Sequence, residues 1–188
     1  MQSIDPSKLF FSTGVLVIIA FALSLFSGYP KNVGDLSFFI VAQGALYGTI
    51  IFMFFMLLGR FFMDRLLSYK NIMIELRSVF SELTWPMIVT LSVMAGVSEE
   101  LLFRGVIQNY VISVSNPFIG VLVSAFIFGL MHFYSRIYVL LTFVAGLIIG
   151  WIYYQTQSLA LIVSLHIVYD ILAFASLVKY PHLLGFND

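Results

Sequence analysis

Long apolar runs separated by short polar segments dominate the sequence. The runs cover residues 9–27, 36–58, 85–114, 117–134, 137–154 and 158–178. Each run is close to or above the ~20 residues that a helix needs to cross the hydrocarbon core, where backbone groups can bond only within the helix. The pattern predicts an all-α fold, a polytopic membrane helix bundle of six transmembrane helices. No small-x-small cleavage motif follows the first run, so we expect this helix to be retained.

Residues 60–82 break this pattern, because charged side chains recur at helical spacing among Leu, Phe and Met. The charged residues are Arg60, Asp64, Arg65, Lys70, Glu75, Arg77 and Glu82. Such a segment is typical of an amphipathic helix that lies in the membrane interface. The pairs Gly44/Gly48 and Gly146/Gly150 have the GxxxG spacing that lets helices approach closely in a membrane.

Basic residues indicate how the chain is oriented in the membrane. If residues 60–82 face the cytoplasm, alternation leaves only Lys31 outside. It places inside Lys8, Arg60, Arg65, Lys70, Arg77, Arg136 and Lys179. This distribution satisfies the positive-inside rule and predicts that both termini are cytoplasmic.

Composition supports the membrane assignment and excludes several other classes. Of the 188 residues, 61% are hydrophobic and 10% are charged, with nine basic and nine acidic residues. A soluble surface cannot be built from so few charges, so membrane lipid is an expected partner. No basic patch suited to nucleic acid is present. The lack of cysteine excludes disulfides, thiolate zinc sites and a cysteine nucleophile.

Six ionisable residues nevertheless lie within three of the predicted spans. They are Glu99, Glu100, Arg104, His132, His166 and Asp170. Even on insertion scales a charge at the bilayer centre costs about 2.5 kcal/mol or more, so such residues mark functional interiors.

Helical spacing sorts these residues by face. Glu100 and Arg104 lie one turn apart, which favours a structural ion pair. Glu99 points away from both, so it needs a partner on another helix or keeps its proton, as suits a general base. His166 and Asp170 also share a face.

If the excess length of the third span lies on the cytoplasmic side, these groups meet His132 at one depth, in a cavity open to the cytoplasm. A base, a water site and oxyanion donors would then be in place for hydrolysis.

Three motifs in order carry a family resemblance. Residues 99–104 read EExxxR, residues 128–132 read FxxxH, and residues 166–170 read HxxxD. Over residues 84–178 the chain resembles the CPBP family, the CAAX prenyl protease and bacteriocin-processing (Abi) proteins. The resemblance implies an N-terminal two-helix extension with an amphipathic segment (1–82) and a catalytic helix core (83–180).

What the resemblance implies is an intramembrane endopeptidase of the bacterial plasma membrane. Its substrates would be membrane-anchored peptides or prenylated CAAX-type C-termini. Glu99 would activate a water with the help of His132, while His166 and Asp170 would stabilise the oxyanion or hold a metal. Glu100 and Arg104 would shape the site.

The chain departs from this family in one position that bears on metal binding. Asp170 stands where eukaryotic and archaeal CAAX proteases usually carry Asn, and an ionised carboxylate cannot donate to an oxyanion. Asp170 would therefore keep its proton, orient His166 or bind a metal. The candidate zinc ligands are Glu99, His132, His166 and Asp170. We expect no obligatory cofactor, with zinc as the alternative.

Other classes of function remain open from the sequence. A bacteriocin self-immunity protein or membrane scaffold could use the same fold without catalysis. Gly96-Val97-Ser98 contains the GxS of rhomboid serine proteases, but the Gly that should follow the serine and the HxxxN helix are missing. A proton-coupled carrier would also bury Glu, His and Arg, but it usually shows inverted repeats. Motifs of zinc site-2 (HExxH) and aspartyl (GxGD) intramembrane proteases are lacking.

Overall fold

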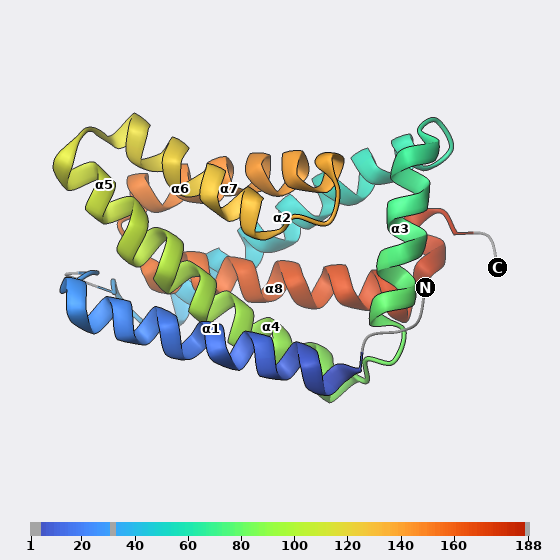
Figure 1. The fold of residues 1–188 in the computed structure, drawn as a ribbon, viewed down its shortest axis with the longest axis horizontal. Coiled ribbons are helices and arrows are strands. Elements are labelled where there is room, and N and C mark those ends of the chain that lie inside the picture. The colour runs from blue at the N-terminus through green and yellow to red at the C-terminus, as the bar shows by residue number, and fades with distance from the viewer. Residues whose placement is uncertain (1–4, 31–32, 187–188) are drawn as a thin grey trace.

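A computed structural model describes residues 5–30 and 33–186, and these residues form a helical bundle (Figure 1). The elements are α1 (Pro6–Ser27), α2 (Phe38–Met63), α3 (Leu67–Phe80), α4 (Trp85–Glu100), the π-helix η1 (Leu101–Gln108), α5 (Asn109–Val114), α6 (Pro117–Met131), α7 (Arg136–Thr156), α8 (Leu159–Val178) and the 3-10 helix η2 (Pro181–Leu184). The predicted all-α membrane helix bundle is confirmed.

Local capping explains where several helices begin and end. Side chains of Asn116, Ser135 and Ser158 each accept a hydrogen bond from the backbone three residues further on, which satisfies a free donor at the first turn of α6, α7 and α8. Gly28 ends α1 in the left-handed conformation, which glycine adopts without a Cβ penalty. The polar turn residues of the sequence therefore set the helix boundaries.

Five helical stretches in the described part of the chain are long and apolar enough to cross a membrane. They are α1, α2, α7, α8 and one continuous stretch, Trp85–Val114. This stretch is made by α4, η1 and α5. The remaining predicted span corresponds to α6, which is apolar but has only 15 residues. It is shorter than predicted because the backbone leaves helical geometry at His132, with φ −95° and ψ 29°.

The amphipathic helix forms over a shorter range than the predicted 60–82. Arg60 continues α2, which ends at Met63, and α3 begins at Leu67. Figure 1 shows α3 lying across one end of the bundle, where α1 begins and α8 ends. One face of α3 is buried, at Tyr69, Ile72, Leu76 and Val79. Lys31 and the two chain ends (1–4 and 187–188) lie outside the described residues, so the cytoplasmic placement of the termini stays a prediction.

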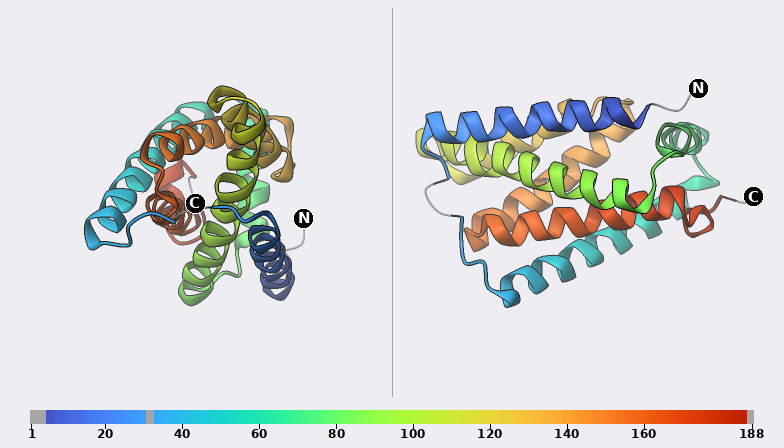
Figure 2. Two further views of the ribbon diagram at one scale, coloured as in Figure 1. Left: turned by 90° about the vertical axis from the view of Figure 1, so that its left-hand side faces the viewer. Right: turned by 90° about the horizontal axis from the view of Figure 1, so that it is seen from below.

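Both glycine pairs bring helices into close contact, as their spacing predicts. A Cβ on Gly44 or Gly48 would lie 2.3 Å from a backbone carbonyl oxygen of α8. A Cβ on Gly146 would lie 3.1 Å from the Cα of Ala125 in α6, and one on Gly150 would lie 2.9 Å from Gln108 Oε1. Figure 2 shows α2 beside α8, and α1 along α4. The division into residues 1–82 and 83–180 stays a prediction.

Candidate active site

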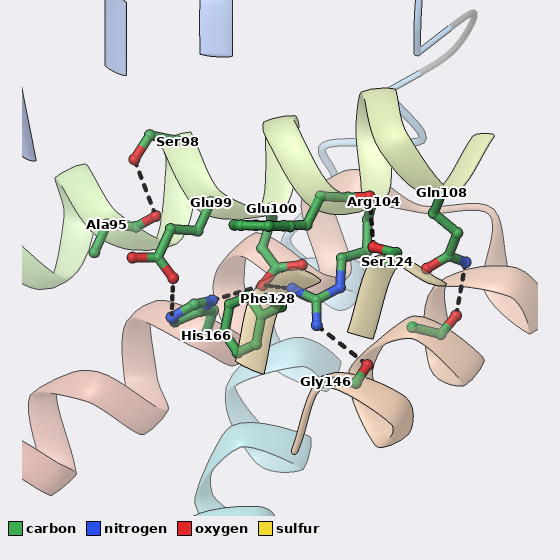
Figure 3. Close-up of polar contacts among 12 residues, drawn as sticks. Ala95, Ser98, Glu99, Glu100, Arg104, Gln108, Ser124, Phe128, Gly146 and His166 are labelled. Atoms are coloured by element: carbon green, nitrogen blue, oxygen red, sulfur yellow. Dashed lines mark hydrogen bonds and ion pairs between the residues drawn. The ribbon is translucent and has the colours of Figure 1, made fainter. Parts of the chain in front are cut away.

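The six ionisable residues singled out in the sequence form one cluster. Figure 3 shows four of them, Glu99, Glu100, Arg104 and His166. Glu99 and Glu100 end α4, and Arg104 follows one turn later in η1. His132 stands at the C-terminal cap of α6. His166 and Asp170 come from α8. Three separate stretches of the chain therefore supply the site.

Glu100 links two of these stretches. Its Oε1 accepts a hydrogen bond from Arg104 Nη1 at 2.8 Å, so the predicted ion pair is present. The same oxygen lies 2.6 Å from Nδ1 of His166 on α8, a contact that the sequence did not indicate. All three side chains are buried. Because the paired guanidinium holds Glu100 as a carboxylate acceptor, Nδ1 of His166 is the donor in this bond.

Both histidines present the same ring nitrogen to Glu99. Nδ1 of His132 lies 2.8 Å from the carbonyl oxygen of Phe128, which can only accept, so this nitrogen also carries a hydrogen. The opposite nitrogens then face the third acid. His132 Nε2 is 3.6 Å and His166 Nε2 is 3.9 Å from Glu99 Oε2. Glu99 thus finds its partners on other helices, as its face predicts.

Glu99 Oε2 is buried but makes no direct hydrogen bond within the described residues. Its separations from the two histidines exceed hydrogen-bonding distance. Asp170 Oδ2 lies 3.5 Å from Nε2 of His166, and the Asp170 side chain is 18% exposed. Separations of this size suit a small polar molecule held between the groups.

A row of polar side chains continues from Glu100 along the π-helix. Arg104 Nη2 donates to the carbonyl oxygen of Gly146 at 3.2 Å, and Gln108 Nε2 donates to that of Gly150 at 2.9 Å. The guanidinium of Arg104 also lies 4.7 Å from the centre of the Phe128 ring. Gln108 was missed in the sequence, although its spacing of four residues from Arg104 indicates the shared face. π-Helical turns are rare and frequently occur at functional sites.

A cavity of about 450 Å³ adjoins the cluster. His132, His166 and Asp170 form part of its wall, together with Tyr138 and Tyr169. The rest of the wall is mainly apolar and aromatic and comes largely from α2, α3, α7 and α8. It reaches the buried face of α3, at the end of the bundle that is expected to be cytoplasmic. No Lys or Arg is among the described residues of this wall. The sequence did not single out these two tyrosines, because it contains many aromatic residues and nothing distinguishes these two from the others.

The four candidate zinc ligands do not form a metal-binding group. Among the described residues no set of three or more His, Asp or Glu side chains has its donor atoms arranged to hold a metal ion. The third histidine of the sequence, His182, is not part of the cluster and lies in η2, after α8.

Comparison with known proteins places this site in a family. Residues 81–172 match the family model described as type II CAAX prenyl endopeptidase Rce1-like. This range contains all six residues of the cluster. No curated protein and no solved structure matches the chain. The fold, the motifs and this match define a membrane protein of a protease class. Residues 81–172 are thus similar to the CAAX prenyl protease (CPBP) family, which confirms the resemblance seen in the sequence.

Proposed function

We propose that the chain is an intramembrane endopeptidase in which Glu99 activates a water. The observation that carries this proposal is the position of Glu99 Oε2. This oxygen is buried, lacks a direct hydrogen bond among the described residues, and faces Nε2 of both His132 and His166. A water between these groups would meet a proton acceptor and two ring nitrogens at once.

The proposed reaction needs only side chains of this site. Glu99 takes a proton from the water as the water oxygen attacks the carbonyl carbon of the scissile peptide bond, with His132 Nε2 orienting the water. His166, when its Nε2 also carries a proton, donates a hydrogen bond to the resulting oxyanion. Glu99 then passes its proton to the leaving nitrogen as the C–N bond breaks. The products are a new carboxyl group and a free amine.

Glu100 and Arg104 act on this reaction through His166. The bond of 2.6 Å to Glu100 Oε1 fixes the orientation of the imidazole ring, and Asp170 flanks the reactive nitrogen. Arg104 balances the charge of Glu100 inside the bundle. A carboxylate that holds the other nitrogen of a reactive histidine is a general means of fixing its tautomer.

The cavity supports a substrate with a large apolar part. Its mainly apolar wall and volume of about 450 Å³ suit a membrane-anchored peptide or a prenylated CAAX-type C-terminus. Membrane lipid would surround the bundle, and we place the protein in a bacterial plasma membrane with both termini in the cytoplasm. No obligatory metal is part of this proposal.

The test is cleavage of membrane-anchored reporter peptides, including a farnesylated CAAX peptide, by purified protein in detergent. Glu99→Gln is nearly isosteric but cannot take up the proton, so we expect turnover to fall by roughly 10²–10⁴-fold. Glu82→Gln, in the loop before α4, is the matched control and should cleave like the wild type. Both are measured with and without a chelator.

The outcomes separate the alternatives. Loss of cleavage in Glu99→Gln alone supports the glutamate mechanism. Loss in the wild type on chelation, restored by zinc, would replace it with a metal-dependent one. Equal cleavage by Glu99→Gln and wild type would contradict the proposal. A folded wild type that cleaves no peptide in the panel would favour self-immunity or another binding role.

A further inference from the structure

Stabilising an oxyanion usually takes more than one donor, and the proposed site offers His166 as the first. Other groups near Glu99 are committed elsewhere or cannot donate. An ionised Asp170 only accepts hydrogen bonds. Arg104 donates to Glu100 and Gly146, and although its Nε has no partner among the described residues, the side chain is 1% exposed and is not among those that line the cavity. The hydroxyl of Thr142 donates back to carbonyl oxygens of its own helix, those of Tyr138 and Val139.

The hydroxyl of Tyr138 is the remaining donor of suitable position. Tyr138 lies in the first turn of α7, where its backbone N–H donates to the capping side chain of Ser135 at 3.1 Å. Its ring centre is 6.5 Å from that of His132, and the side chain lines the cavity together with His166 and Asp170. The phenol therefore borders the same cavity as His132 and His166, the two histidines that lie beside Glu99. Within the described ranges it makes no hydrogen bond.

Tyr169 is the competing hydroxyl, but its surroundings differ. Its ring packs edge-on against Phe52 and Phe55 of α2, with ring centres 6.4 and 6.3 Å away. Among the described residues Tyr169 has no ring contact with His132, whereas Tyr138 has one. Tyr138 is therefore the tyrosine that borders His132, the residue proposed to orient the water.

We propose that Tyr138 is a further catalytic residue, whose hydroxyl donates a hydrogen bond to the carbonyl oxygen of the scissile bond as that oxygen becomes an oxyanion. This inference rests on the proposed function. A phenol ordinarily keeps its proton at neutral pH, so the group acts as a donor without transferring a proton. His166 and Tyr138 would then hold the oxyanion from α8 and α7, while Glu99 approaches from α4.

The experiment compares Tyr138→Phe with Tyr154→Phe on a peptide that the wild type cleaves. Tyr154 is the matched control, because it lies on the same helix but near its other end, against Trp151. Removing one oxyanion donor lowers turnover by about 10²–10³-fold in a well-studied protease. We expect a fall in kcat of this order for Tyr138→Phe, with KM within about threefold, and no change for Tyr154→Phe. The Tm should stay constant, because no partner group loses its hydrogen bond.

A second measurement separates binding of the oxyanion from structure. The probe is a phosphinate analogue of the cleaved peptide, whose charged oxygen occupies the place of the oxyanion. Its affinity for Tyr138→Phe should fall by about the same factor as kcat. Unchanged kcat, or a fall in kcat with unchanged phosphinate affinity, would overturn the role of Tyr138 alone. A wild type that cleaves no peptide would instead overturn the proposed function, and the role of Tyr138 with it.

Discussion

Glu100 and Arg104 form an ion pair that is buried inside an apolar bundle. The guanidinium donates to Glu100 and to the carbonyl of Gly146, so its charge is paired and partly hydrogen-bonded. Breaking a buried pair by removing one partner typically costs about 3–5 kcal/mol, whereas replacing both partners with apolar residues is often neutral. Stability and activity should therefore respond differently to changes at these two positions.

We expect Arg104→Met to lower the Tm in detergent strongly, because it leaves the Glu100 carboxylate buried without its cation. The double variant Glu100→Leu/Arg104→Met should recover most of this loss. It should not recover peptide cleavage, because Nδ1 of His166 loses its acceptor. Thermal unfolding and cleavage are measured on the same preparations. A double variant that cleaves like the wild type would show that Glu100 does not position His166.

These residues also show what the sequence could predict. Helical spacing correctly assigned the Glu100–Arg104 pair and the separate face of Glu99, because both depend on a single helix. It did not predict that Glu100 contacts His166, because spacing within one helix says nothing of which side chain on another helix lies opposite. Tyr138 was missed for the same reason. It becomes notable only once α7 is seen to border the cluster.

Helix packing depends on glycine where α2 meets α8. A Cβ on Gly48 would lie 2.3 Å from the carbonyl oxygen of Leu165, and this atom belongs to the backbone. The helices would have to move apart, which would displace His166, the next residue along α8. The GxxxG spacing predicted this close approach, but it could not tell which helix is the partner.

We expect Gly48→Ala to lower stability by about 1–3 kcal/mol, the usual cost of overpacking a tight interface. The control is Gly14→Ala in α1, where the added Cβ would lie 3.9 Å from the side chain of Met94, an ordinary contact. Thermal unfolding in detergent gives both values. Equal Tm values for the two variants would contradict the close packing of α2 on α8.

The arrangement of the complete bundle predicts which of its ends faces the cytoplasm. Helix α3 and the beginning of α7 lie at one end, and the connection between α5 and α6 lies at the other (Figure 1). The positive-inside rule predicts that the end with α3 faces the cytoplasm. The cavity reaches that end, so the same orientation decides from which side a substrate tail approaches the site.

Because the chain contains no cysteine, single Cys variants report this orientation without background. Lys70 on α3 and Ser115 between α5 and α6 are both exposed. A maleimide that cannot cross membranes should label Lys70→Cys only in inside-out vesicles and Ser115→Cys only in spheroplasts. Labelling in the reverse pattern would place the cavity end of the bundle outside the cell. A cytoplasmic CAAX-type tail could then not reach Glu99 from that end, and substrates anchored on the outer face would take its place.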